Sequence, residues 1–184
     1  TEDSHYSLEN YYAISKISGG SLVKYYRDNK NIFACTGFLF NHESSLRTEN
    51  YLSKKITSYV AQLSESRNDK LSLGSLDMSV DWGYAPDYVE AFRRILQTSS
   101  PDDYIVATGV KSSIKDFVKI AFEHVDLDYR KYVTVDPNIL IRKNETRIGS
   151  AKKLMKATGW KPSISFQEMV KKLVDIEIKK FKSI

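Results

Sequence analysis

The apolar positions of the chain alternate between helical spacing and short, nearly continuous runs. Residues 10–26 carry apolar side chains at helical spacing, and the segment Ile32–Phe40 that follows is apolar almost throughout. Such a run is typical of a strand covered on both faces, as in a parallel sheet. A second helical pattern covers about residues 50–64, and Leu71–Leu73, which Gly74 ends, predicts a short strand.

The rest of the chain continues this alternation. Residues 81–87 predict a turn from which Asp87 caps a helix over residues 88–97, because Pro86 stops any upstream continuation. The later patterns predict a strand, a helix capped by Ser112 or Ser113, a strand and two helices, at residues 104–107, 113–125, 132–135, 150–158 and 165–179. This order favours a doubly wound α/β fold.

No G-x-G-x-x-G motif occurs among the eight glycines, so the unit that cradles a dinucleotide phosphate is absent. We therefore expect either a fold without a dinucleotide site or the second part of a longer chain. In the second case the first part lies upstream of Thr1.

Composition narrows the class of protein further. The single cysteine, Cys35, excludes an internal disulfide, and His5, His42 and His124 are too scattered for a zinc site built from histidine and cysteine. No apolar run approaches the length of a membrane span, and the polar start is unlike a secretory signal, which indicates a cytoplasmic protein without a membrane partner.

The net charge of +5 permits a polyanionic partner, either nucleic acid or a phosphorylated small molecule. Much of the excess positive charge belongs to lysines of the C-terminal helices, where it has no nucleic-acid-binding pattern. We therefore expect no nucleic-acid partner. A basic nucleic-acid binder stays open as an alternative whose affinity would fall steeply with salt.

Tyr12 and Lys16 lie one helical turn apart in the sequence Y-Y-A-I-S-K. They therefore share a helix face and are separated by about 6 Å along its axis. An isolated phenol is a poor base near neutrality, but an ammonium beside it favours the phenolate. The same spacing occurs at Tyr26/Lys30 and Tyr51/Lys55, so a plain helix-surface tyrosine with a neighbouring lysine is the alternative.

A polar loop, Asn41-His42-Glu43-Ser44, follows the apolar run at 32–40. Open α/β sheets bind their ligands beyond the carboxyl ends of their strands, so we expect this loop at a binding site. For His42 the alternative is a loop histidine that hydrogen-bonds to its own backbone.

These motifs resemble the extended short-chain dehydrogenase/reductases, and within them the GDP-mannose 4,6-dehydratase group. The resemblance covers about residues 11–166. It rests on Y-Y-A-I-S-K, on F-A-C-T-G-F-L-F-N-H-E-S, on L-G-S-L-D-M-S-V-D-W-G-Y-A-P-D-Y-V-E-A, on D-D-Y-I-V-A-T-G and on A-T-G-W-K-P. It implies the C-terminal part of such an enzyme: a partial Rossmann-type sheet plus a small α/β substrate-binding domain.

The resemblance also assigns roles to individual residues. Tyr12 matches the general base that takes the proton of the sugar C4 hydroxyl while hydride passes to NADP, and Lys16 matches its partner, which also bonds the nicotinamide ribose. His42 and Arg47 match cofactor-contacting residues. Four further positions match residues that bind the sugar nucleotide, namely Asn41, Lys55, Arg142 and Glu145. For these long basic side chains, simple exposure to water is the alternative.

The domain assignment that follows is residues 1–45 as the end of the NADP-binding domain and residues 46–184 as mainly the substrate-binding domain. The family's acid/base glutamate and its hydroxyl partner precede the tyrosine helix. We therefore expect the 184-residue chain alone neither to bind NADP tightly nor to dehydrate GDP-mannose. Relatives commonly form homodimers or homotetramers, and the resemblance implies the same here.

Two departures from the family pattern concern the substrate. After N-H-E-S the family usually has two adjacent arginines and a glycine, but here the stretch is Ser45-Leu46-Arg47-Thr48, and Val80 replaces an arginine before D-W-G. Losing a charge-assisted contact of roughly 1.5–3 kcal/mol would weaken or redirect substrate binding. Alternatives therefore stay open: a dehydratase, reductase or epimerase for another nucleotide sugar such as GDP-heptose, or a non-catalytic domain that retains the fold.

Overall fold

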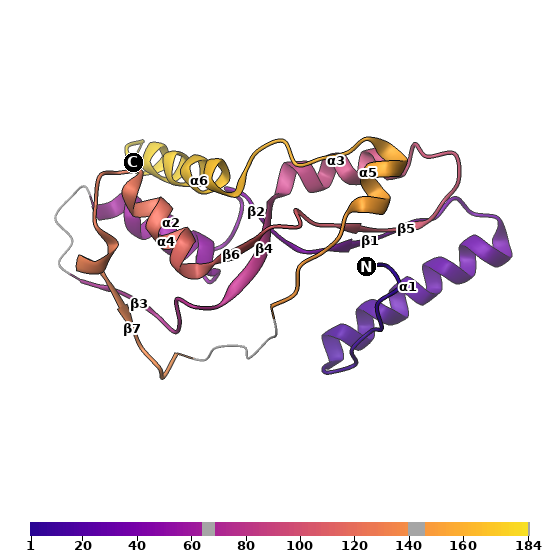
Figure 1. Cartoon of the computed structure of the whole chain (residues 1–184), viewed down its shortest axis with the longest axis horizontal. Helices are drawn as coiled ribbons and strands as arrows, with labels where there is room; N and C mark the ends of the chain where they lie inside the picture. The colour runs from indigo at the N-terminus through magenta and orange to yellow at the C-terminus, as the bar shows by residue number, and fades with distance from the viewer. Residues whose placement is uncertain (64–68, 140–145, 184) are drawn as a thin grey trace.

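The helix α1 (Tyr11–Lys30) lies along one end of the structure, a computed structural model that describes residues 1–63, 69–139 and 146–183 (Figure 1). The helix begins where the side chain of Asn10 accepts a hydrogen bond from the backbone N–H of Ala13 (2.9 Å). It ends at Asn31, which adopts a left-handed conformation with φ of 51°. None of the residues of α1 is buried.

A two-stranded parallel sheet lies beside α1 and is formed by β1 (Thr36–Leu39) and β5 (Asp103–Val106). The helices α3 (Ala85–Ile95) and α5 (Lys152–Thr158) pack against it on the side away from α1 (Figure 1). Their apolar side chains form one of two cores, which contains Tyr88, Ala91, Ile95, Tyr104, Val106, Ala151, Leu154 and Trp160.

The three strands β2 (Asn41–Glu43), β4 (Ser79–Tyr84) and β6 (Lys111–Ser113) connect the two ends of the elongated structure (Figure 1). β4 is the central strand of this sheet. It pairs with β2 in parallel and with β6 in antiparallel orientation. β2 begins two residues after β1 ends, so the chain passes directly from one sheet into the next.

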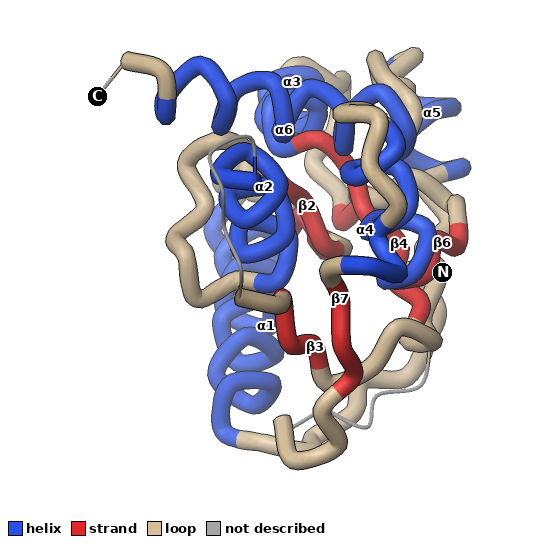
Figure 2. Tube along the Cα trace, turned by 90° about the vertical axis from the view of Figure 1, so that its left-hand side faces the viewer, coloured by secondary structure: helices blue, strands red, loops and turns tan. Residues whose placement is uncertain are grey.

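The second core fills the other end of the structure. It lies among α2 (Leu52–Gln62), α4 (Ile114–Glu123), α6 (Phe166–Phe181) and β4 and includes Ile56, Trp82, Phe117, Phe122 and Val170. Two short parallel strands, β3 (Leu71–Leu73) and β7 (Val133–Val135), flank it, and the 3-10 helix η2 (Tyr129–Lys131) precedes β7. Figure 2 shows β3 and β7 side by side.

Two helix starts follow directly from local sequence. Ser113 accepts a hydrogen bond from the backbone N–H of Asp116, whose carboxylate in turn accepts from the backbone N–H of Ser113. Ser165 and Glu168 form the same reciprocal arrangement at the start of α6. Both are capping boxes, so the cap predicted at Ser112 or Ser113 is confirmed at Ser113.

The turn predicted over residues 81–87 is wrong. Residues 79–84 form β4, and α3 begins at Ala85 with Pro86 in its first turn. Asp87 is therefore inside the helix rather than its cap, and its buried carboxylate accepts a hydrogen bond from the backbone N–H of Ser163 (3.0 Å). Gly83, within the predicted turn, belongs to the strand because its backbone pairs with that of His42. A glycine is required there because the ring of Tyr88 occupies the space where a Cβ would lie.

Two smaller expectations also change. Asn41, His42 and Glu43 form the strand β2 rather than a loop, because their backbones pair with Trp82, Gly83 and Tyr84. The strand β6, which the sequence patterns did not predict, pairs with Ser79–Asp81. Within the described ranges, no helix is long and apolar enough to cross a membrane.

Candidate active site

Tyr12 and Lys16 lie together on the face of α1 that looks toward β1. Nζ of Lys16 is 5.4 Å from the centre of the Tyr12 ring, and 72% of Tyr12 is exposed. Both side chains line a cavity of about 460 Å³, here named the Lys16 cavity, together with Gly37 and Phe38 of β1. The catalytic pair predicted from sequence is therefore placed at an open cavity beside a parallel strand.

The Lys16 cavity suits a ligand that carries hydroxyl groups or negative charge. Among the described residues that line it, Lys16 and Arg147 are cationic and none is a carboxylate. An ammonium beside a phenol can hold ribose or sugar hydroxyls while it favours the phenolate. These residues thus fit the ribose end of a nicotinamide dinucleotide.

The strand β2 sends its side chains to opposite faces of the sheet. Nδ1 of His42 donates a hydrogen bond to the backbone oxygen of Phe40 (2.9 Å), and its ring lies 4.9 Å from that of Tyr88. Asn41 and Glu43 point the other way, into a cavity of about 590 Å³ that we name the Lys55 cavity. Because successive side chains of a strand point to opposite faces, the side chain of His42 lies on the other face of the sheet from those of Asn41 and Glu43.

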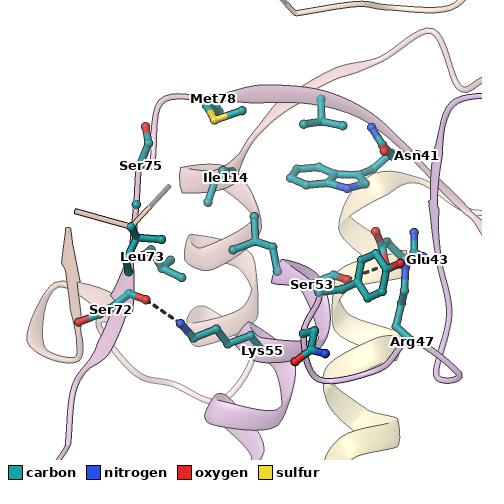
Figure 3. Close-up of a pocket in the computed structure, with 17 residues that line it drawn as sticks. Asn41, Glu43, Arg47, Ser53, Lys55, Ser72, Leu73, Ser75, Met78 and Ile114 are labelled. Carbon is teal, nitrogen blue, oxygen red and sulfur yellow. Dashed lines mark hydrogen bonds and ion pairs between the residues drawn. The ribbon is translucent and has the colours of Figure 1, made fainter. Parts of the chain in front are cut away.

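The Lys55 cavity is bordered by two groups of side chains that face each other across it (Figure 3). On one side, Nε of Arg47 donates to Glu43 (3.0 Å), and the guanidinium lies 4.1 Å from the centre of the Tyr51 ring. On the other side, Nζ of Lys55 donates to the backbone oxygen of Ser72 (2.9 Å).

Glu43 holds this arrangement in place. Its side chain is buried, and it accepts hydrogen bonds from Ser53 (2.6 Å) as well as from Arg47. Arg47 also donates to the backbone oxygen of His42 (3.1 Å). The guanidinium is therefore oriented before any ligand binds, which lowers the entropy cost of a contact with an anion.

A third cavity, of about 480 Å³ and here named the central cavity, joins the other two. It shares Tyr12 with the Lys16 cavity and Asn41, Met78 and Val80 with the Lys55 cavity. The three cavities are therefore neighbours, and we name the row that they form, from Lys16 to Lys55, the groove. An extended ligand could contact Tyr12 at one end and Lys55 at the other.

The site residues predicted from sequence do not all line the groove. Tyr12, Lys16, Asn41 and Lys55 line the groove. Arg47 lines its far end, away from Lys16, and His42 is not among the residues that line any of the three cavities. Arg142 and Glu145 fall outside the described residues. The roles predicted for all these side chains stay predictions.

Comparison with known proteins assigns the family. A sequence profile described as GDP-mannose 4,6 dehydratase matches residues 1–173. The chain belongs to the GDP-mannose 4,6-dehydratase family. The resemblance drawn from the sequence motifs is thereby confirmed.

Individual relatives agree with this GDP-mannose 4,6-dehydratase assignment. The chain is 38% identical to GDP-mannose 4,6 dehydratase 2 of Arabidopsis thaliana over 168 residues, a match that covers 91% of the chain and 45% of the relative. It is 33% identical to the GDP-mannose 4,6 dehydratase of Homo sapiens, with 91% of the chain and 50% of the relative covered. The chain thus spans about half the length of the curated relatives it matches.

Solved structures show the same fold as this member of the GDP-mannose 4,6-dehydratase family. RMD of Pseudomonas aeruginosa, solved with NADPH, superimposes with a TM-score of 0.87 at 20% identity, covering 97% of this chain and 59% of that one. The dTDP-glucose 4,6-dehydratase of Bacillus anthracis, solved with NAD, gives a TM-score of 0.84 at 17% identity, with coverages of 99% and 56%. The expected α/β fold with partial parallel sheets is confirmed.

The sequence motifs did not reveal Asp81, whose buried carboxylate holds backbone segments beside the site. This carboxylate is fully buried and accepts hydrogen bonds from the backbone N–H groups of Thr108 (3.0 Å), Gly109 (3.0 Å) and Gly149 (3.1 Å). It also accepts from the hydroxyl of Thr108 (2.5 Å). The signal was present in the sequence as a charged residue between apolar Val80 and Trp82, a position that predicts a satisfied buried group.

Proposed function

We propose that this chain provides the tyrosine helix and the nucleotide-sugar-binding part of an NADP-dependent 4,6-dehydratase. The whole protein would convert GDP-mannose to GDP-4-keto-6-deoxymannose and would therefore be a lyase. The observation that carries the proposal is the groove in which Tyr12 and Lys16 occupy one end and Asn41 and Lys55 line the adjoining cavities.

Tyr12 would act as the general base on the sugar. Its phenolic oxygen takes the proton of the C4 hydroxyl, and the charge of Lys16 stabilises the phenolate. Bound NADP would supply the hydride acceptor. Lys16 would hold the ribose hydroxyls, and we extend the cofactor contacts to His42 and Arg47 on the basis of the family resemblance alone.

Asn41 and Lys55 would bind the substrate beyond the sugar. The amide of Asn41 lies where the central and Lys55 cavities meet, and an ammonium at Lys55 can contact a diphosphate oxygen. The Arg142 and Glu145 side chains would contact the nucleotide ribose, an assignment that rests on the sequence resemblance.

We further propose the division at residue 45 into the end of a cofactor-binding domain and a mainly substrate-binding part. The two separate cores support a division of this kind, although α3, β5 and α5 share the core beside β1. We also propose a homodimer or homotetramer and a cytoplasmic location.

The direct test is the conversion of nucleotide sugars by the whole protein in the presence of NADP. We expect mass spectrometry to show loss of one water from GDP-mannose, and we expect the Tyr12→Phe variant to show none. If GDP-mannose binds but stays intact while the wild-type protein dehydrates another nucleotide sugar, the substrate assignment is wrong and the reaction class stands.

One observation favours a second candidate substrate. Val80 lines both the central and the Lys55 cavities and is a small apolar residue where the family pattern has an arginine, so the wall of the groove differs in size and charge there. A dehydratase for a different nucleotide sugar, such as a GDP-heptose, would fit this change. A panel that contains GDP-mannose, a GDP-heptose, dTDP-glucose and UDP-glucose separates the two, because the preferred substrate has the highest kcat/KM.

A further inference from the structure

Arg147 enters the groove from a segment far away in sequence from Tyr12. It lines both the Lys16 cavity and the central cavity. Its side chain is 64% exposed, and its guanidinium lies 3.5 Å from the carboxylate of Glu9, which is 62% exposed. An ion pair between two such exposed side chains is weak, so the guanidinium is available to a ligand.

Arg147 differs from the other cations of the groove because it lines the central cavity. The Lys16 cavity contains Lys16, and the Lys55 cavity contains Arg47 and Lys55. Among the described residues that line the central cavity, the charged ones are Glu9 and Arg147. A negatively charged ligand group in the central cavity therefore has one cation to contact, together with the amide of Asn41.

A hydrogen bond to β4 holds the backbone close to Arg147 in place. Two residues further on, the N–H of Gly149 donates to the buried carboxylate of Asp81 (3.1 Å). A Cβ at position 149 would lie 2.3 Å from that of Ala107, so a glycine is required for this close approach. Asp81 thereby anchors the segment that carries Arg147 to β4.

We infer that Arg147 contacts the diphosphate of the bound nucleotide sugar and helps to determine which substrates are accepted. The inference rests on the proposed function. If the sugar reacts at Tyr12, the next group along the substrate is the diphosphate, and the next cavity along the groove is the central one. A guanidinium can form two parallel hydrogen bonds to phosphate oxygens there, beside the apolar Val80.

Binding of a diphosphate also requires Arg147 to leave Glu9. Glu9 is the acidic neighbour in the same cavity, and its charge repels a phosphate. Removal of this charge should therefore favour binding. Loss of the Arg147 charge should weaken binding of the diphosphate, whereas loss of the Glu9 charge should strengthen it. A merely structural role would not produce this pair of opposite effects.

The test is calorimetric titration of the whole protein with GDP and, separately, with guanosine. We expect Arg147→Gln to weaken GDP binding about tenfold or more and to leave guanosine binding unchanged. Arg147→Lys should restore part of the affinity. Glu9→Gln should tighten GDP binding by about twofold to fivefold, the range of a partly exposed charge.

Arg130→Gln is the matched control. Arg130 is also exposed and paired with a carboxylate, that of Asp128, but lines none of the three cavities. Its variant should bind GDP as the wild type does. Equal melting temperatures of all variants would show that the effects on binding do not arise from unfolding.

Three other results would overturn the inference. If Arg147→Gln binds GDP as the wild type does while Lys55→Gln binds it weakly, the inference about Arg147 is wrong and the proposed function stands. If guanosine binding falls as much as GDP binding, Arg147 does not act on the phosphates and the inference is equally overturned. If the wild-type whole protein binds no nucleoside diphosphate at millimolar concentration, both the proposed function and this inference fail.

Discussion

The ammonium of Lys16 lies over the ring of Tyr12, with Nζ 5.4 Å from the ring centre. About four turns further along the same helix, Tyr26 and Lys30 have the same spacing in sequence, but neither lines the Lys16 cavity. The spacing of a tyrosine and a lysine is thus common to both pairs. What distinguishes Tyr12 and Lys16 is the cavity beside β1.

We predict that Tyr12→Phe reduces kcat of the whole protein for the proposed dehydration by about a hundredfold or more, because the proposed base for the C4 hydroxyl is lost. Tyr26→Phe is the matched control and should keep nearly full activity. The measurement is product formation under saturating substrate and cofactor. Equal losses in both variants would show that the two tyrosines contribute only to the helix.

A second prediction concerns the attachment of α1. Arg27 donates to both carboxylate oxygens of Asp103 (2.7 and 2.9 Å), and its side chain is only 11% exposed. Asp103→Asn would leave this guanidinium with a weaker partner. We expect the free energy of unfolding to fall by about 1–2 kcal/mol, less than for a fully buried pair.

The control for this prediction is the exposed pair formed by Arg130 and Asp128. Asp128→Asn removes the same type of charge and should leave the free energy of unfolding nearly unchanged, because water screens this exposed pair. Urea denaturation of both variants measures the difference. A loss as large in Asp128→Asn would mean that net charge rather than burial determines the effect.

The same pair predicts a dependence of stability on pH. Burial raises the pKa of Asp103, but the hydrogen bonds from Arg27 and from the Thr36 backbone N–H outweigh it, so the pKa lies below its usual value. A carboxylate with a lower pKa in the folded state stabilises the fold above its unfolded pKa, at about pH 4. This contribution is lost as the pH falls through the folded pKa.

We therefore expect the wild type to be more stable than Asp103→Asn at pH 7, and the difference to shrink below about pH 4. Urea denaturation of both proteins at a series of pH values measures it. A difference that stays constant down to pH 2 would show that Asp103 acts through its shape rather than its charge.

A fourth prediction compares two glycines. A Cβ on Gly83 would lie 2.2 Å from the ring of Tyr88, whereas a Cβ on Gly19 would meet no atom within 4 Å. Gly83→Ala should therefore destabilise the fold by about 1–3 kcal/mol through overpacking. Gly19→Ala, in the exposed helix α1, should stabilise it by about 0.5–1 kcal/mol.

Thermal unfolding of the two variants gives the comparison, since both add the same methyl group. Because the Tyr88 hydroxyl also donates to the backbone oxygen of Asn41 (3.4 Å), Gly83→Ala should additionally weaken nucleotide binding in the groove that Asn41 lines. If Gly83→Ala raises the melting temperature, the close approach of Tyr88 to β4 is wrong.

The sequence by itself determined the features that depend on neighbours within one helical turn. The capping boxes at Ser113 and Ser165 need only a partner three residues away, and the pairing of Tyr12 with Lys16 needs only four. The motifs were also sufficient for the family, because several of them recur in a fixed order along nearly the whole chain.

Only the tertiary structure decided what depends on partners distant in sequence. Residues 41–43 form a strand because β4 pairs with them from about forty residues away, and that strand turns His42 from the groove. Arg147 joins Tyr12 because the buried carboxylate of Asp81 fixes Gly149. Such contacts form between segments that no local pattern relates, so the long-range packing of the chain determines them.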